Sequence, residues 1–262
     1  MAPLAHAQGK LEAQYTATVA GITIGKGNWV IEITDQHYKA AASGVATGLV
    51  RIFTGGKGAT AAQGLLSAGK PISTIYASTI TNRKKTDEVR LTFANGNVKD
   101  FKVDPPAGKD ASRVPLTEAH KRGVMDPMTA SLLRSPGPGN PVSRDACQHT
   151  LAIFDGRMRY DLQLAFKRMD HVKASKGYSG DVVVCAVYFA PVAGYIPSRS
   201  TIKYLSKQRD MEVWLAPIAG THVLVPFRAQ SPTPIGEAVL TATQFVATPM
   251  PTRASSNGTR TP

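Results

Sequence analysis

The stretch Glu88-Val-Arg-Leu-Thr-Phe-Ala-Asn95-Gly96-Asn-Val-Lys-Asp-Phe-Lys-Val103 decides the fold class. Polar and apolar side chains alternate from Glu88 to Phe93, which is typical of a strand with one buried and one exposed face. Asn95-Gly96 is the strongest short signal for a two-residue hairpin turn, and a second strand-like run follows it. The stretch therefore predicts an antiparallel β-hairpin.

The same kind of pattern extends in both directions from this hairpin. Strand-like runs occupy 15–21, 27–33, 38–43 and 72–81 before it, and 148–154, 158–167, 181–188, 200–205, 212–216, 221–228 and 236–246 after it. Short strands separated by regular turns favour an all-β domain. We expect a mainly β fold: one large curved antiparallel sheet, an open barrel or β-spiral, within a single β-rich domain over residues 8–247.

One or two short helices are expected in the polar connection between the two halves. Asp126 can cap a helix over 126–133 and Pro127 fits its first position, and 117–123 is a second candidate. Residues 48–53 fit either a short helix or a buried strand, and we interpret the Gly-rich run 55–58 as a surface turn. Residues 248–262 are rich in Pro, Thr and Ser and are predicted to be a disordered tail.

The charge balance suggests the kind of partner. Thirty-one Lys and Arg against 18 Asp and Glu give a formal net charge of +13. The excess is spread along the chain, and the basic cluster 83–85 is followed by acidic residues, so it is interpreted as a solvated hairpin tip. A diffuse positive charge predicts attraction to anionic surfaces, and we expect no nucleic-acid partner. Because no apolar run reaches the ~18 residues that a spanning helix needs, the sequence predicts a protein that does not span a membrane.

The first residues predict export. Ala5-His6-Ala7 has the small-x-small form of a secretory cleavage site, so residues 1–7 are interpreted as the remnant of a signal peptide. Cleavage near Ala7 would leave a mature protein that begins at Gln8 in the periplasm. An ordinary Ala-rich N-terminus is the alternative.

Catalytic and metal-binding patterns are weak. The six His residues show no metal-ligand spacing, no Ser lies in a GxSxG setting, and no carboxylate pair stands out. Cys147 and His149 could form a thiol and base, but no third group orients them. We therefore predict no catalytic residue, no cofactor and no metal ligand, and we expect the protein not to be an enzyme.

The two cysteines and two tryptophans are the candidate special residues. Cys147 and Cys185 are predicted to form a disulfide that closes a loop and contributes ~4 kcal/mol, with two separate buried thiols as the alternative. Trp29 and Trp214 each lie in a strand-like run and are predicted to pack in the core. The alternative is that they contact a ligand in a groove. Trp214 is the stronger candidate, because the charged Glu212 lies two residues away on the same face of the strand-like run.

Four motifs resemble those of the bacterial family called domain of unknown function 3108. They are Tyr15-Thr-Ala-Thr-Val-Ala-Gly-Ile-Thr-Ile-Gly25, Asp126-Pro-Met-Thr-Ala130, Met211-Glu-Val-Trp-Leu-Ala216 and Val223-Leu-Val-Pro-Phe-Arg228, and the resemblance covers roughly residues 12–246. It implies an exported envelope protein with no assigned activity. It also implies a curved, β-rich periplasmic fold, and no catalytic residue can be carried over.

These observations together predict a non-catalytic periplasmic protein that supports cell-envelope integrity. Its expected partner is an envelope component, such as lipid, lipopolysaccharide or peptidoglycan, or a periplasmic protein. A carrier of a lipid or other amphiphile in the barrel interior is one alternative, and a hydrolase of envelope polymers is another. A groove filled by the protein's own side chains would favour the non-catalytic role, whereas converging ionisable groups would favour the enzyme. The sequence leaves the oligomeric state open.

Overall fold

The computed structural model describes residues 8–47, 56–83, 85–137 and 139–250. The predicted signal-peptide remnant, the ambiguous run 48–53 and most of the predicted tail lie outside the described residues. The prediction of a mainly β fold is confirmed, because fifteen strands within these described ranges form one sheet that does not close.

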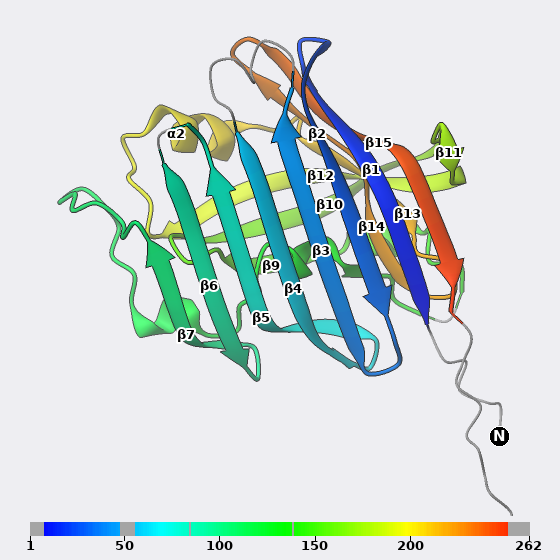
Figure 1. Cartoon of the computed structure of the whole chain (residues 1–262), viewed down its shortest axis with the longest axis horizontal. Coiled ribbons are helices and arrows are strands. Elements are labelled where there is room, and N and C mark those ends of the chain that lie inside the picture. The colour runs from blue at the N-terminus through cyan, green and yellow to red at the C-terminus, as the bar shows by residue number, and fades with distance from the viewer. Residues whose placement is uncertain (1–7, 48–55, 84, 138, 251–262) are drawn as a thin grey trace, which may run out of the picture.

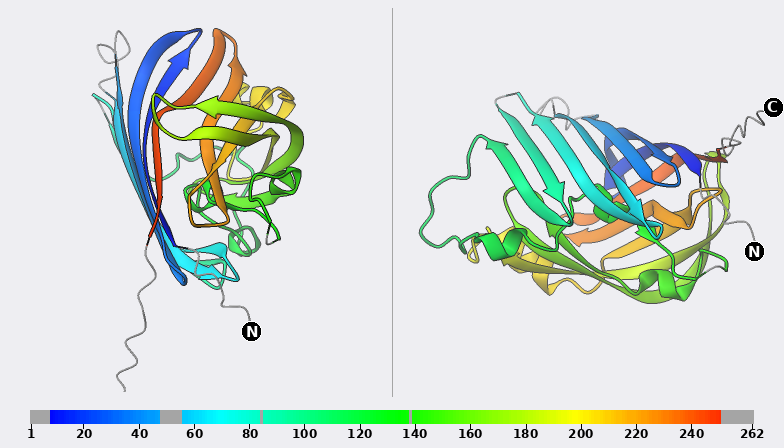
Figure 2. Two further views of the ribbon diagram at one scale, coloured as in Figure 1. Left: turned by 90° about the vertical axis from the view of Figure 1, so that its right-hand side faces the viewer. Right: turned by 90° about the horizontal axis from the view of Figure 1, so that it is seen from below.

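The sheet runs in the order β7-β6-β5-β4-β3-β2-β1-β15-β14-β13-β12-β10-β9. Its first half contains β1 (Gly9–Val19), β2 (Ile22–Ile33), β3 (His37–Ala46), β4 (Lys57–Ser67), β5 (Lys70–Thr81), β6 (Thr86–Ala94) and β7 (Asn97–Asp104). Its second half contains β9 (Thr150–Phe154), β10 (Arg159–Lys173), β12 (Ser179–Ala193), β13 (Glu212–Pro217), β14 (Val223–Thr233) and β15 (Gly236–Pro249). The sheet is strongly curved, so its second half lies behind the first half (Figures 1 and 2).

Two short strands lie off this path. β8 (Leu133–Arg134) pairs with the start of β14, and β11 (Lys176–Gly177) pairs in parallel with β15. The hairpin that decides the fold class forms as predicted: β6 and β7 pair around Asn95 and Gly96, whose φ angles of 51° and 73° are typical of a tight hairpin turn.

The sequence prediction is wrong for β4. Lys57 and Gly58, interpreted as part of a surface turn, begin a strand that pairs with β3 on one side and β5 on the other. Ala and Gly make up five of the eleven residues of this strand, and both have a weak intrinsic preference for strands. Backbone pairing with two neighbours outweighs that local preference.

The helices also differ from the prediction. Residues 200–205, predicted as a strand, belong to α2 (Ser200–Lys207), whose half-buried Ile202 and Leu205 are spaced as on one helix face. The predicted helix over 126–133 is wrong, since only a short 3₁₀ turn, η2 (Thr129–Ser131), forms there. Two further 3₁₀ turns are η1 (Glu118–Lys121) and η3 (Arg144–Cys147). Thr248 and Pro249, assigned to the tail from the sequence, pair with β1 at the end of β15.

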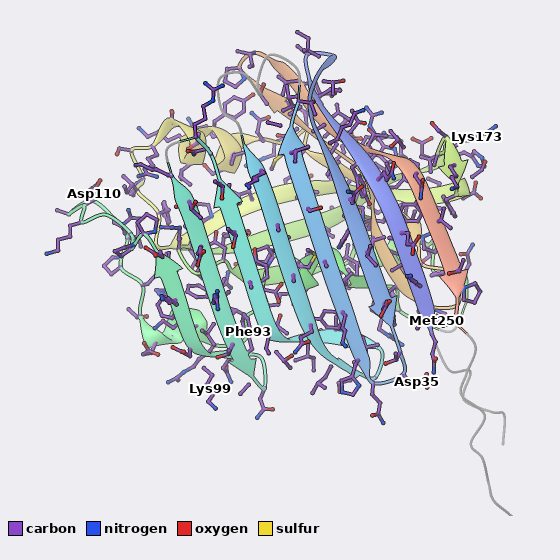
Figure 3. All side chains as sticks on the ribbon, in the orientation of Figure 1. Asp35, Phe93, Lys99, Asp110, Lys173 and Met250 are labelled. Carbon is purple, nitrogen blue, oxygen red and sulfur yellow. A yellow bond between two sulfur atoms is a disulfide. The ribbon has the colours of Figure 1, made fainter. Side chains whose placement is uncertain are left out.

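The core consists of two clusters of buried side chains. The larger cluster joins both halves of the sheet and contains the aromatic residues Tyr15, Trp29, Tyr38, Tyr76, Phe93, Phe154, Trp214, Phe227 and Phe245. The smaller cluster packs residues 130–153 against β12, β13 and β14 and includes Cys147 and Cys185. Figure 3 shows how densely side chains cover the sheet. No helix in the described part of the chain is long and apolar enough to cross a membrane.

Candidate functional site

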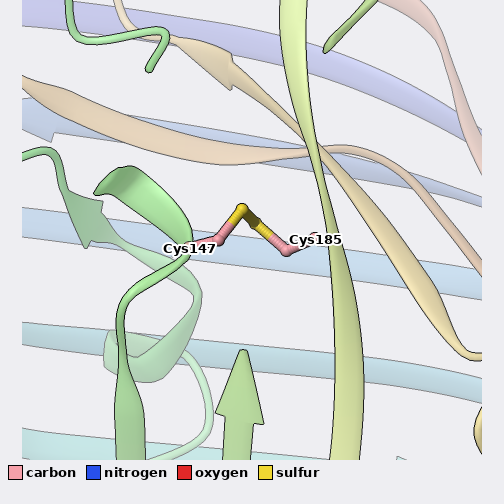
Figure 4. Close-up of a disulfide and its surroundings, with 2 residues drawn as sticks. All are labelled: Cys147 and Cys185. Atoms are coloured by element: carbon pink, nitrogen blue, oxygen red, sulfur yellow. A yellow bond between two sulfur atoms is a disulfide. The ribbon is translucent and has the colours of Figure 1, made fainter. Parts of the chain in front are cut away.

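Cys147 and Cys185 form a disulfide in the smaller core cluster (Figure 4). Cys147 ends η3 and Cys185 lies in β12, with their Cα atoms 5.5 Å apart and both residues fully buried. The bond ties the connection between the two halves of the chain to the sheet. It also excludes the thiol-and-base pairing of Cys147 with His149, because neither cysteine is free.

Trp29 lies on β2 in the larger core cluster. Its side chain is 8% exposed, and its ring lies 6.4 Å from that of Tyr15, centroid to centroid. The indole Nε1 is buried and has no hydrogen-bond partner. Trp29 therefore contributes apolar packing and makes no polar interaction in the core.

Trp214 lies on β13 in a very different setting. Its Nε1 donates a hydrogen bond of 2.8 Å to Asp170 Oδ2, and this bond is the main reason that the pKa of Asp170 lies below its usual value. The guanidinium groups of Arg168 and Arg228 lie over the indole ring, 5.2 and 5.0 Å from its centroid. Trp214, 5% exposed, thus lies among charged groups on β13.

Glu212, which shares a strand face with Trp214, is also buried and pairs with cations. Its carboxylate contacts Lys167 Nζ and lies 2.9 Å from Arg168 Nη2. Burial alone would raise the pKa of Glu212, but the hydrogen bonds from Arg168 and Lys167 outweigh it and lower the pKa. Glu212 therefore forms a charge-paired group with Lys167 and Arg168 beside Trp214.

A fully buried polar network holds the segment that follows η1. Asp126 Oδ2 accepts hydrogen bonds from Ser73 Oγ (2.6 Å) and Thr129 Oγ1 (2.5 Å), and Oδ1 accepts one from the Thr129 backbone N–H (2.9 Å). Tyr38 Oη lies 2.5 Å from Thr129 Oγ1. Burial raises the pKa of Asp126, although these hydrogen bonds oppose the shift. The network fastens η2 to β3 and β5.

A cleft of about 490 Å³ opens beside this network. Its walls come from the β4–β5 turn, from η2 and β8, and from the residues that follow η3. The polar lining includes Lys70, Arg134 and His149, and the apolar lining includes Leu132 and Leu151. Clefts of about 300–1,000 Å³ with a few polar groups on an apolar lining are typical small-molecule sites.

His149 is the most unusual polar residue of the cleft. Burial and the nearby Lys70 ammonium lower its pKa, while a hydrogen bond to the backbone of Arg134 opposes the shift. Its Nε2 is buried and has no hydrogen-bond partner. A neutral imidazole with one free nitrogen can accept a hydrogen bond from a ligand or, once protonated, donate one.

Sequence reasoning did not identify this cleft. Lys70, Thr129, Arg134 and His149 lie on three separate segments, and no motif spacing links them. The one usable signal was Asp126-Pro127, interpreted only as a helix start. Among the described residues, no three His, Cys, Asp or Glu side chains gather where they could share a metal ion.

Comparison with known proteins gives a family and a distant structural likeness. The family model described as "Protein of unknown function (DUF3108)" matches residues 14–243. A crystal structure of a β-barrel-like protein of domain of unknown function DUF1849 from Brucella abortus aligns with 92% of this chain and 98% of its own, at 7% identity and a TM-score of 0.46. No curated protein matches the sequence. The chain therefore belongs to the DUF3108 family.

Proposed function

We propose that this member of the DUF3108 family is an exported, non-catalytic protein that binds an envelope component or a periplasmic protein and supports the integrity of the cell envelope. The filled core carries the proposal. Phe227 and Phe245 lie 5.5 Å apart, centroid to centroid, and Tyr178 packs against both rings. Tyr15 on β1 joins the two halves of the sheet, because its Oη donates a 2.7 Å hydrogen bond to the backbone carbonyl of Pro226 on β14. An interior occupied by the protein's own side chains suits a binding scaffold better than a carrier that holds an amphiphile inside a barrel.

The disulfide supports the export part of the proposal. Disulfides form and persist in oxidising compartments such as the bacterial periplasm and are rare in the cytosol. The Cys147–Cys185 bond joins two fully buried residues, so it has the position of a structural bond rather than a surface redox pair.

Exposed cations on α2 support binding to an anionic envelope surface. Lys203 and Lys207 are four residues apart on one side of α2, and Arg199, the residue that precedes the helix, lies four residues before Lys203. None of the three forms an ion pair within the described residues. Like charges at this spacing destabilise an isolated helix, and an anionic partner would offset their repulsion.

A hydrolase of envelope polymers is less well supported. Burial raises the pKa values of Asp126 and Asp155, which is a property of many catalytic acids. Each carboxylate is nevertheless occupied: Asp126 holds the buried network, and Asp155 Oδ1 accepts hydrogen bonds from the backbone N–H groups of Arg157 and Met158 in a turn. Both aspartates therefore stabilise the fold through these hydrogen bonds.

The test is fractionation of cells that express the complete gene from its own translation start. We expect the protein in the periplasmic fraction, with a mature N-terminus at Gln8 and with cysteines that alkylate only after reduction. Native mass spectrometry of the purified protein should then show a co-purifying envelope molecule or a stable protein complex. A protein recovered in the cytoplasm with freely alkylated thiols would contradict export, and turnover of peptidoglycan or lipopolysaccharide that Asp126→Asn abolishes would contradict the non-catalytic role.

A further inference from the structure

We propose that the cleft between the β4–β5 turn, β8 and residues 145–151 binds an amphiphilic anion, in which a carboxylate or phosphate headgroup is attached to an apolar chain. The inference deepens the proposed function by naming a ligand class, and it rests on that function only for the ligand's origin. The ligand would lie at the side of the molecule rather than in the filled interior between the halves of the sheet.

Two unpaired cations define the polar end of the cleft. Neither Lys70 nor Arg134 forms an ion pair within the part of the chain that the structure describes. Asp145 is the acidic residue of the lining, and its Oδ1 already accepts a hydrogen bond from Gln148 Nε2 at 2.9 Å. The lining therefore carries two positive charges against one negative charge, which favours an anionic ligand.

The position of Arg134 depends on the neighbouring turn. A Cβ atom on Gly69 would lie only 2.6 Å from Arg134 Nε, and Gly69 has a φ of 75°, which L-residues rarely adopt. Glycine at this turn thus allows the guanidinium to lie against the backbone between β4 and β5. Because β8 also pairs with β14, Arg134 is held from two sides before any ligand binds.

His149 lies in the same lining as these cations. Lys70 and the backbone of Arg134 are close enough to His149 to affect its pKa, so the three residues lie together at the polar end of the cleft. The three side chains come from separate segments, so the fold itself assembles them.

The rest of the lining suits an apolar chain. Leu132, Leu133 and Leu151 are each more than nine-tenths buried in the protein, and Met125 and Pro71 complete this part of the cleft. Apolar area removed from water contributes about 25 cal/mol per Å², so an alkyl chain on this lining would add affinity that a free inorganic anion lacks.

The test is calorimetric titration of the purified, oxidised protein with four probes: sodium decanoate below its micellar concentration, decyl phosphate, inorganic phosphate and 1-decanol. We expect decanoate and decyl phosphate to bind at one site, each about tenfold or more tighter than phosphate or decanol, because a hydrogen-bonded charge contributes more than about 1.4 kcal/mol. Equal binding of decanol would overturn the proposal in favour of a plain apolar depression. Equal binding of phosphate would overturn it in favour of an anion site with no role for the chain.

Variants locate the site. Lys70→Gln and Arg134→Gln should each weaken decanoate binding about tenfold, and Arg90→Gln, which removes an exposed cation on β6, should leave it unchanged. His149→Gln serves as the third variant if Arg134→Gln lowers the melting temperature. Binding that survives all three changes would overturn the assignment. These titrations use purified protein, so their failure would leave the proposed export untouched, and a cytoplasmic location would not alter them.

Discussion

Replacing each tryptophan by phenylalanine tests whether the two residues play the different roles that their surroundings indicate. Both side chains are buried, at 8% exposure for Trp29 and 5% for Trp214, so both variants lose a similar apolar contact area. Only Trp214 uses its indole N–H, which bonds to Asp170, and only its ring lies beneath two guanidinium groups. Trp29 leaves its N–H without a partner.

The expected difference follows from those contacts. A hydrogen bond to a charged acceptor contributes about 1.5–3 kcal/mol, and the lower end applies here because Asp170 is half-exposed. Each cation–π contact adds about 0.5–1 kcal/mol, part of which phenylalanine retains. Trp214→Phe should therefore destabilise the protein by about 2 kcal/mol more than Trp29→Phe. For a chain of this size the extra loss corresponds to a melting temperature about 4–8 °C lower.

Urea and thermal unfolding of both variants, with Asp170→Asn in each background, measure this difference. The Asp170 change should have little effect on Trp214→Phe and a clear effect on the wild type, because the hydrogen bond is already lost in the variant. The folded-state pKa of Asp170 lies below the ordinary value of 3.8, so its stabilisation is present at neutral pH and lost as the pH falls through the folded-state pKa. Equal destabilisation by both tryptophan variants at pH 7 would refute the reasoning.

Three further predictions concern the anchors of the fold. Replacing Cys147 and Cys185 by serine should lower the free energy of unfolding by about 4 kcal/mol, because the disulfide closes a loop with a sequence separation of 38. A non-reducing gel of proteolysed wild-type protein checks that the disulfide is present. Asp126→Ala should lower the free energy of unfolding in urea by about 2–4 kcal/mol. Asp126→Asn should lower it by less, because the amide oxygen can still accept the hydrogen bond from the Thr129 backbone N–H. Equal losses in the two variants would contradict this explanation. Gly64→Ala should cost about 3 kcal/mol in thermal unfolding, since its Cβ would lie 2.0 Å from a backbone oxygen of β5, whereas Gly58→Ala, whose nearest contact is 3.7 Å, should be nearly neutral.

The hairpin and its neighbours could be predicted because the signals there are local. Asn95-Gly96 specifies a turn by its own backbone preferences, and strict alternation on either side specifies which face is buried. In the structure, Leu91 and Phe93 are indeed buried while Arg90 is exposed. Local preference and tertiary packing agree in this region, so the sequence alone is enough.

β4 and α2 could not be predicted because their own residues give weak or misleading local signals. The Ala- and Gly-rich β4 is stabilised by backbone pairing with β3 and β5, its neighbours in the chain, rather than by the preferences of its own residues. In α2, the β-branched residues Thr201 and Ile202 favour a strand by propensity. The helix forms where one half-buried face packs against β12, and Arg209 covers the ring of Tyr188 just beyond its end.

The candidate cleft could not be predicted from the sequence either, because its residues come from separate segments of the chain. Lys70 and Arg134 are ordinary surface residues in sequence, and neither lies in a recognisable pattern. Asp126 looked like a helix cap and does bond to the Thr129 backbone, but its larger role is to fasten the segment to Ser73 on β5. That partner is 53 residues away in the chain, so spacing could not reveal it.

The anchors of the fold and the walls of the cleft are the same features. Thr129 belongs both to the Asp126 network and to the lining, and His149 lies two residues after the disulfide-bonded Cys147. Arg134 is held by the pairing of β8 with β14. Each wall is thus fixed by a separate structural element before a ligand arrives, which reduces the conformational entropy that binding must offset. The buried network and the disulfide therefore stabilise the connection between the two halves of the chain and, by the same contacts, pre-organise the groups that we propose receive an anionic headgroup.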